Sequence, residues 1–249
     1  MAIPTDRVLA RLDEHLRKND YISAKRHLSY WLSEAEQSGD FRGELLISNE
    51  LMGLCRKLDE CEEAFAYADR ALMLIEKMQI EENVGAATTY LNSATVCKAF
   101  GRADQAIPLF KRALKIYERE LSLSDERLGG LYNNMGLAFV DLGRFIEADV
   151  SYQKALAVMQ GEAGREPEVA ITYLNIASAR EAEYGLDGAK EAIRECVERA
   201  MELFDSCRER SDGDYAYACE KCAAVFGYYG YTDYEKELTE RCRRIYEGA

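Results

Sequence analysis

The sequence is poor in residues that break helices or build flexible linkers. Only three prolines occur in 249 residues, and no serine-rich run or block of like charge interrupts the chain. β-Branched residues are sparse, whereas leucine, alanine, glutamate, lysine and arginine dominate, which favours helix. These shortages exclude a long linker. The 48% of hydrophobic residues indicates a folded chain, and the composition makes this chain mainly helical.

Long apolar runs and an excess of positive charge are also missing. No apolar run approaches 18 residues, so no membrane-spanning helix is predicted. The first residues, MAIPTDRVLARLDEH, contain no apolar segment of signal-peptide length. The net charge of −13 disfavours nucleic acid and anionic membranes as partners. The composition therefore predicts a cytoplasmic protein with neither kind of partner.

Signatures of catalysis are scarce too. The chain has two histidines and contains no phosphate-binding loop, nucleophile elbow or H-E-x-x-H motif. Carboxylates are abundant, but no pair stands isolated in an apolar setting, as a general acid requires. We therefore expect no enzyme activity, no catalytic residues and no cofactor.

Eight cysteines are present, and we expect them to be reduced in a chain of this length without a secretion signal. Cys219 and Cys222 form a C-x-x-C pair, but a zinc site needs four ligands, and no second pair or nearby histidine exists. In a helix these two side chains lie on one face, as core residues do. No metal site is predicted, and thiol or zinc chemistry at the C-terminal cysteines remains a less favoured function.

A 42-residue repeat organises the middle of the chain. Three sets of residues recur at this step: Ala64, Ala106 and Ala148; Ala71, Ala113 and Ala155; and Leu72, Leu114 and Leu156. The segments around them have apolar residues at helical spacing and charges on the opposite face. They alternate with helical segments that end at a turn, at Gly101 and Gly143 in two repeats. Each repeat therefore predicts two antiparallel helices, and stacked pairs build a solenoid.

The pattern extends with weaker sequence to both ends. We predict a single helical-repeat domain over residues 1–249, with hairpins at about 5–38, 42–79, 84–121, 126–160, 167–206 and 212–247. The fifth hairpin is out of step, because 23 residues separate Ala177 from Ala200, whereas 19 separate Ala94 from Ala113. Four extra residues make about one helical turn, so a helix or its turn should protrude at 181–188.

These repeats resemble the tetratricopeptide repeat family. The matching residues are the small residue of the first helix (Ala94, Gly136 or Ala177) and the second-helix pairs Ala106 with Phe110 and Ala148 with Tyr152. The 42-residue step and the segments IPLFKRALKIYE and EPEVAITYLNIA are similar to repeats of the kinesin-light-chain type. The resemblance covers about residues 42–178. It implies an all-α fold, a right-handed superhelical solenoid of about six antiparallel helix hairpins, and a binding role.

Asparagines mark the candidate binding surface. Asn92, Asn134 and Asn175 each lie two residues before the small residue, about 160° around the helix from it. In the family that the chain resembles this face lines the inner groove, and Asn133 flanks it. Side-chain amides donate and accept, so they can bind the backbone of an extended peptide. Alternatively, they bond to neighbouring helices or the preceding loop and hold the repeats together; both roles can hold at once.

The remaining candidate binding residues are basic. Arg56, Lys57 and Lys98 would suit an acidic or phosphorylated segment, although surface lysines are often simply solvated. The clamp for a C-terminal carboxylate found in some family members is missing, because the matching positions are Ile171 and Asn175 itself. We predict a non-catalytic scaffold that binds a protein or peptide segment in its concave groove. The alternative is a regulator that senses a signalling peptide and acts through a partner protein.

Two further features carry expectations about packing. The aromatic run FGYYGYTDY (226–234) either caps the end of the solenoid or forms a surface for a second copy of the chain or another partner. Gly136 should lie where the two helices of its hairpin approach closely. Leucine should overpack this contact, whereas alanine should be tolerated, because Ala94 and Ala177 occupy the equivalent positions.

Overall fold

The computed structural model describes residues 2–160 and 162–248, and helices make up most of them. The twelve helices in these ranges are α1 (Thr5–Arg17), α2 (Tyr21–Ser38), α3 (Phe41–Lys57), α4 (Cys61–Met78), α5 (Val84–Ala99), α6 (Ala103–Glu120), α7 (Glu126–Asp141), α8 (Phe145–Met159), α9 (Glu166–Gly188), α10 (Lys190–Ser206), α11 (Gly213–Tyr228) and α12 (Thr232–Glu247). The described ranges contain no strand. The predicted all-α fold class is confirmed.

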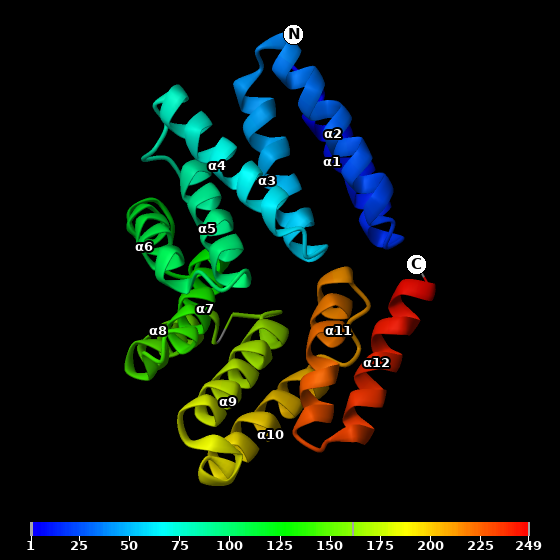
Figure 1. Ribbon diagram of the computed structural model, residues 1–249. Coiled ribbons are helices and arrows are strands. Elements are labelled where there is room, and N and C mark those ends of the chain that lie inside the picture. The colour runs from blue at the N-terminus through cyan, green and yellow to red at the C-terminus, as the bar shows by residue number, and fades with distance from the viewer. Residues whose placement is uncertain (1, 161, 249) are drawn as a thin grey trace. The chain divides into compact units, whose positions relative to one another are not determined.

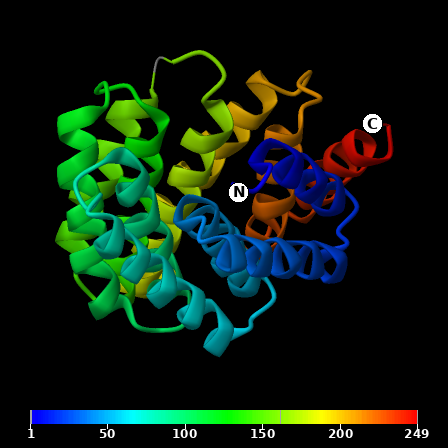
Figure 2. The same cartoon turned by 90° about the horizontal axis from the view of Figure 1, so that it is seen from above.

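Consecutive helices pack against each other as six hairpins, α1 with α2 through α11 with α12. The pairs can be followed along the chain in Figure 1 and from above in Figure 2. The chain divides into two compact units, one ending at Leu121 and containing α1–α6, the other starting at Ser122 and containing α7–α12. Within the units, first helices of neighbouring hairpins also touch, α3 with α5, α7 with α9 and α9 with α11.

The repeated alanines are core residues of the second, third and fourth hairpins. Ala64, Ala71, Ala106, Ala113, Ala148 and Ala155 are all completely buried. A methyl group fills little space, so helices that meet at alanine can approach to the short end of the usual 8–10 Å axial distance. The recurrence of these alanines is therefore a recurrence of core positions, whereas Leu72 and Leu114 of the third set are only partly buried.

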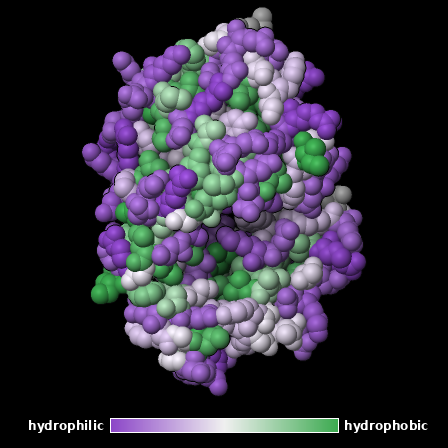
Figure 3. All heavy atoms as spheres, in the orientation of Figure 1, coloured by the Kyte–Doolittle hydropathy of each residue, from purple (hydrophilic) through white to green (hydrophobic). Residues whose placement is uncertain are grey.

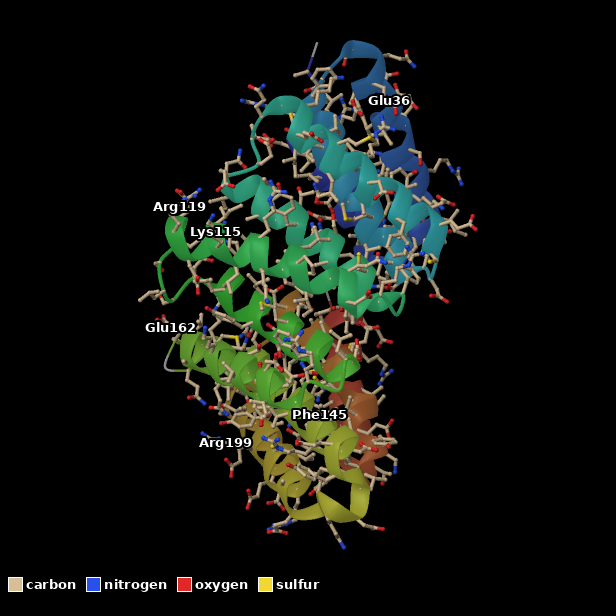
Figure 4. All side chains as sticks on the ribbon, turned by 60° about the vertical axis from the view of Figure 1, so that its left-hand side comes forward. Glu36, Lys115, Arg119, Phe145, Glu162 and Arg199 are labelled. Atoms are coloured by element: carbon tan, nitrogen blue, oxygen red, sulfur yellow. The ribbon has the colours of Figure 1, made fainter. Side chains whose placement is uncertain are left out.

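Helix ends follow local chemistry. Gly101 and Gly143 adopt φ values of 74° and 68°, the left-handed conformation that a Cβ disfavours and that ends a helix. At other ends an acidic side chain caps the next helix: Asp212 Oδ1 accepts from the Tyr215 N–H at 3.0 Å. The turn after α4 is held by Arg119 of α6, which donates to Glu82 at 3.0 Å. Arg119 lies one turn beyond Lys115 on α6 (Figure 4).

The insertion in the fifth hairpin lengthens its first helix. α9 has 23 residues, whereas α5 and α7 have 16 each. It is interrupted at Gly185, whose φ of 73° and ψ of 166° are not helical. Tyr184 and Leu186 beside this kink are exposed. The predicted protrusion at 181–188 is confirmed.

The close contact at Gly136 is present and is tighter than expected. A Cβ on Gly136 would overlap Cε1 of Tyr152 and lie 2.7 Å from Cδ1 of the same ring, which is completely buried. The prediction that alanine is tolerated there is therefore wrong for this backbone. The Tyr152 ring lies directly against the glycine and leaves no space for a methyl group, even though alanine occupies the equivalent positions in neighbouring hairpins.

The aromatic run 226–234 joins the last hairpin to α9. Phe226 is completely buried, and its ring centroid lies 4.9 Å from that of Tyr234. The Tyr229 hydroxyl donates to Glu181 Oε2 at 2.9 Å. Tyr228 bonds the same carboxylate but keeps most of its ring in solvent. The run thus packs within the second unit and leaves one tyrosine ring exposed.

The described helices include none that combines the length and the apolar character required to cross a membrane. Polar side chains dominate the face drawn in Figure 3, and apolar side chains occur there in small groups between them.

Candidate functional site

Three of the predicted asparagines line one groove of the second unit. Asn133 and Asn134 come from α7 and Asn175 from α9, and the groove has a volume of about 280 Å³. Its other lining residues are Glu126, Gly129, Gly130, Leu137, Met159, Arg165, Glu168, Ile171 and Lys221. We call it the amide groove. Helices α7, α9 and α11, the first helices of their hairpins, supply most of its walls.

The amides of this groove are partly engaged with each other. Asn175 Nδ2 donates to Asn133 Oδ1 at 3.1 Å, which links α9 to α7. Asn134 Nδ2 donates to the Gly130 carbonyl of its own helix at 2.9 Å. Within the described residues, Asn133 Nδ2 and Asn175 Oδ1 have no hydrogen-bond partner. The bonded pair therefore presents a free donor and a free acceptor to the groove.

The charges around the amides are mixed. Arg165 forms an ion pair with Glu126 and lies 3.5 Å from Glu168 Oε1. Partial burial acts to lower the pKa of Arg165, but the bond to Glu126 raises it above its ordinary value, so the guanidinium stays charged. Glu168 Oε2 is buried and has no hydrogen-bond partner in the described ranges. Lys221 is exposed and has no carboxylate within 4.0 Å among those residues.

Lys221 is a groove residue that the sequence interpretation missed. Asn133 and Asn175 are 42 residues apart, and Asn175 and Lys221 are 46 apart. The difference equals the four-residue insertion of the fifth hairpin. Carrying the repeat register across that insertion would have placed Lys221 at the asparagine position of the last hairpin.

Asn92 lies in the first unit and takes part in a chain of hydrogen bonds there. Its Nδ2 donates to Asn49 Oδ1 at 3.0 Å, and Asn49 Nδ2 donates in turn to Thr89 Oγ1 at 3.0 Å and to the Leu45 carbonyl at 2.9 Å. The bonds join α3 to α5. Asn49, 43 residues before Asn92, was also missed. The bonding to neighbouring helices that the sequence left open is thus present for Asn92 and Asn175.

The predicted basic residues are all in the first unit, near the ends of helices. Arg56 and Lys57 occupy the last turn of α3, and Lys98 occupies that of α5. Arg56 is seven residues after Asn49, so it shares its face about 10 Å along the axis. Lys98 is six residues after Asn92, about 120° away around the helix. The Lys57 ammonium lies 4.5 Å from the centre of the Tyr21 ring, a cation–π contact.

The C-x-x-C cysteines are core residues. Cys219 and Cys222 are buried in the cluster that joins α9–α12. Burial raises the pKa of the Cys219 thiol to about 11 and that of Cys222 to about 12. All eight cysteines are free. Near neutral pH these two thiols remain protonated, which disfavours metal binding and nucleophilic chemistry.

One cluster of potential metal ligands occurs among the described residues, at Cys55, Glu60 and Glu63. The Lys25 ammonium lies 2.7 Å from a carboxylate oxygen of each glutamate. Burial raises the pKa of the Cys55 thiol to about 12. The cluster already contains its own cation and a protonated thiol, so it is an ion-pair network between α2, α3 and α4.

Comparison with known proteins agrees with this fold. Residues 44–119 and 130–158 match models of the tetratricopeptide repeat. Within these two stretches the chain carries tetratricopeptide repeats. The chain is similar to protein KINESIN LIGHT CHAIN-RELATED 3 of Arabidopsis thaliana, with 22% identity over 174 residues, and this similarity agrees with repeats of the kinesin-light-chain-like type. That match covers 66% of this chain and 24% of the relative, so the chain spans about a quarter of the relative's length.

Solved structures show the same architecture. BtubC (BKLC) from P. vanneervenii is similar with a TM-score of 0.70 and 20% identity, over 83% of this chain and 82% of that chain. A Rap protein complexed with Competence and Sporulation Factor is similar with a TM-score of 0.55 and 15% identity, over 96% and 73%. At sequence identities of 20% and 15%, the similarity shows a shared fold only. The chain is a helical-repeat scaffold of a kind consistent with protein binding.

Proposed function

We propose that this chain is a non-catalytic scaffold that binds an extended peptide segment of a partner protein in the amide groove. One observation carries the proposal: three side-chain amides and a lysine, which has no ion pair among the described residues, line a single groove of about 280 Å³. Such a set recognises the peptide backbone through hydrogen bonds, which tolerate varied side chains.

The bonded pair Asn133–Asn175 would form the centre of this contact. A peptide carbonyl would accept from Asn133 Nδ2, and the peptide N–H would donate to Asn175 Oδ1.

Charge favours an acidic segment as the ligand. Glu126, Glu168 and Arg165 interact with one another, which leaves Lys221 as the groove cation without an ion pair among the described residues. An aspartate or glutamate of the ligand next to the backbone contact would pair with Lys221. In the first unit, by contrast, the Asn49 amide already donates to Thr89 Oγ1 and to the Leu45 carbonyl, so the Asn49–Asn92 pair has less hydrogen-bonding capacity left for a ligand.

A cytoplasmic location and a peptide ligand have separate support. Eight free cysteines fit a reducing compartment. The similar Rap structure is a complex with Competence and Sporulation Factor, which supports a peptide as the ligand class. Tyr228, which stays exposed at the last hairpin, is the residue on which a contact with a second copy would rest.

Peptide selection tests the proposal while the natural ligand is still unidentified. The whole chain is screened against a displayed library of random peptides, and the affinity of selected peptides is measured by fluorescence anisotropy. The double variant Asn133→Ala, Asn175→Ala should bind about 10-fold more weakly, because two hydrogen bonds of about 0.5–1.5 kcal/mol are lost. Lys221→Met should weaken the acidic peptides more than the neutral ones.

The pair in the first unit supplies the matched control. Asn49→Ala, Asn92→Ala removes the same amide–amide bond at the equivalent helices and should leave affinity within about twofold, if the second unit holds the main site. Thermal melts of both doubles show whether the fold is intact. Equal losses in the two doubles, or none in either, would mean that the amide groove is not the binding surface.

A peptide-sensing regulator is the second candidate, favoured by the fold similarity to the Rap protein over 96% of this chain. A regulator differs from a scaffold in that the peptide must change the affinity for another protein. Partner proteins captured by the chain with and without a selected peptide are compared by mass spectrometry. A partner that is gained or released when the peptide is added indicates the regulator; an unchanged set indicates the scaffold.

A further inference from the structure

The last two hairpins enclose a second cavity, distinct from the amide groove in position and chemistry. Its volume is about 310 Å³, and its lining residues are Arg208, Arg210, Ser211, Tyr215, Arg241, Arg244, Ile245 and Gly248. They come from the α10–α11 connection, the first turn of α11 and the end of α12. Four arginines and no carboxylate stand among these described lining residues, in a chain with a net charge of −13. We call it the arginine cavity.

Two of the arginines are held rigidly in its wall. Arg241 has only 5% of its side chain exposed and donates to Asp205 Oδ1 at 2.7 Å, to the Tyr215 hydroxyl at 3.0 Å and to the Phe204 carbonyl at 3.2 Å. Burial alone would lower its pKa, but the bonds to Asp205 and Glu237 raise it above the ordinary value. Its charge is balanced by these two carboxylates, which do not line the cavity.

Arg210 is fixed in a similar way. Its Nε and Nη2 donate to the two oxygens of Asp212 at 2.8 and 2.9 Å, and its Nη1 donates to the Gly164 carbonyl at 2.7 Å. Every nitrogen of this guanidinium is engaged. Arg210 and Arg241 therefore shape the cavity and have little hydrogen-bonding capacity left for a ligand.

The other two arginines are loosely held. Arg208 Nε lies 3.7 Å from Glu209 Oε1, and Arg244 Nε lies 4.0 Å from Glu240 Oε1 and 3.4 Å from the Glu240 carbonyl. Their side chains are 62% and 67% exposed. Each keeps its two terminal nitrogens, the fork that binds an oxyanion in bidentate fashion, without a partner in the described ranges.

We propose that the arginine cavity binds a phosphate monoester, with Arg208 and Arg244 as the two clamps and the Ser211 hydroxyl as a further donor. A phosphate monoester offers three acceptor oxygens and a charge of about −1.5 to −2, enough for two guanidinium forks and a hydroxyl. A carboxylate has two oxygens and suits one fork. Ile245, which is partly exposed, supplies an apolar wall for the carbon side of the ester.

The size of the cavity limits the ligand. A volume of about 310 Å³ is at the small end of ligand sites, so one phosphorylated side chain or one small phosphate ester fits. This ligand differs from the peptide backbone proposed for the amide groove, and none of the lining residues is shared. The inference therefore stands without the proposed function.

Titration of the whole chain with simple probes tests the inference. Inorganic phosphate, phenyl phosphate, a phosphoserine peptide and acetate are compared by isothermal calorimetry at matched ionic strength. We expect saturable binding of the phosphorylated probes. Arg208→Gln and Arg244→Gln should each weaken it about 10-fold or more, because each removes a bidentate, charge-assisted contact. Arg243→Gln is the matched control: Arg243 neighbours Arg244 on α12 and is paired with Glu240 and Glu247, but does not line the cavity.

Two of the possible outcomes support the cavity and identify the source of its ligand, and the others contradict the proposal. Tighter binding of the phosphoserine peptide than of inorganic phosphate identifies a phosphorylated protein segment, and the reverse order identifies a free phosphate compound; both support the cavity. Equal affinity for acetate and for the phosphorylated probes, or an equal loss of affinity in all three arginine variants, would mean that the binding comes from general charge attraction. Either result overturns the proposal. Absence of saturation below about 10 mM overturns it as well.

Discussion

At the scale of single residues, the fourth hairpin shows how one aromatic side chain restricts which residue can pack against it. Tyr152 takes the position that Phe110 holds 42 residues earlier, and both are completely buried. The ring requires glycine at position 136, because a Cβ there would overlap it. The phenol hydroxyl that distinguishes tyrosine from phenylalanine has no hydrogen-bond partner among the described residues. These two facts lead to two opposite predictions of stability.

Tyr152→Phe should stabilise the protein. Removing a buried hydroxyl that lacks a partner removes its desolvation cost, so we expect a gain of about 1 kcal/mol in the free energy of unfolding by urea. Tyr117→Phe is the control: this tyrosine is equally buried, but its hydroxyl lies 2.8 Å from Thr88 Oγ1. The control should lose about 0.5–1.5 kcal/mol. A loss of similar size in both variants would mean that the Tyr152 hydroxyl has a partner in solution.

Gly136→Ala should destabilise the protein by about 1–3 kcal/mol, despite the gain in helix propensity, because the Tyr152 ring must move out of a packed core. Gly53→Ala is the matched helical control, since a Cβ at Gly53 meets nothing within 4 Å. It should be neutral or slightly stabilising. Urea unfolding of both variants is the measurement, and a Gly136→Ala variant as stable as the parent would contradict the close contact.

At the scale of helices, capping side chains determine where the helices begin. A carboxylate cap also makes the stability of its helix depend on pH. Asp212 caps α11 and accepts from both Nε and Nη2 of Arg210. The bond to Arg210 is the main cause that lowers the pKa of Asp212 to about 2, and the bond from the Tyr215 N–H adds to it. The ionised carboxylate is therefore the form that supports the start of α11.

This cap gives a prediction with a defined sign. Because the pKa of Asp212 is lower in the folded than in the unfolded chain, its contribution is complete above about pH 4 and disappears as the pH falls towards 2. Asp212→Asn should therefore be less stable than the parent at pH 6, and the difference should shrink on acidification. Urea unfolding of both proteins from pH 6 to pH 2.5 measures it. A difference that does not change with pH would contradict the role of the charge.

At the scale of the whole molecule, the two units are the main organisational feature. The second unit has its own core, which forms between helices α9–α12. Phe204, Tyr215 and Phe226 are completely buried in it. We expect a fragment of residues 122–249 to fold alone, with helical circular dichroism and a cooperative thermal transition. A fragment that melts without cooperativity would instead support the single domain over residues 1–249 predicted from the sequence.

The sequence by itself determined the repeating part of this protein. Helical periodicity, a 42-residue recurrence of alanines and left-handed glycines at helix ends are local or periodic signals, and they predicted the helix pairs, the core alanines and the protrusion of α9. The same register indicated Asn133, Asn134 and Asn175. It could have indicated Asn49 by carrying the register back one repeat, and Lys221 by carrying it forward across the four-residue insertion.

Only the tertiary structure decided which partner each polar side chain takes. The bonds Asn92–Asn49 and Asn175–Asn133 join residues 43 and 42 positions apart, and Arg208 and Arg244 line the same cavity from different parts of the chain. The Tyr152 ring that excludes alanine at position 136 belongs to the same class of contact. Such contacts depend on how closely two helices pack and how each is rotated about its axis. A pattern along one helix shows which face a residue occupies, but not the atom that it meets.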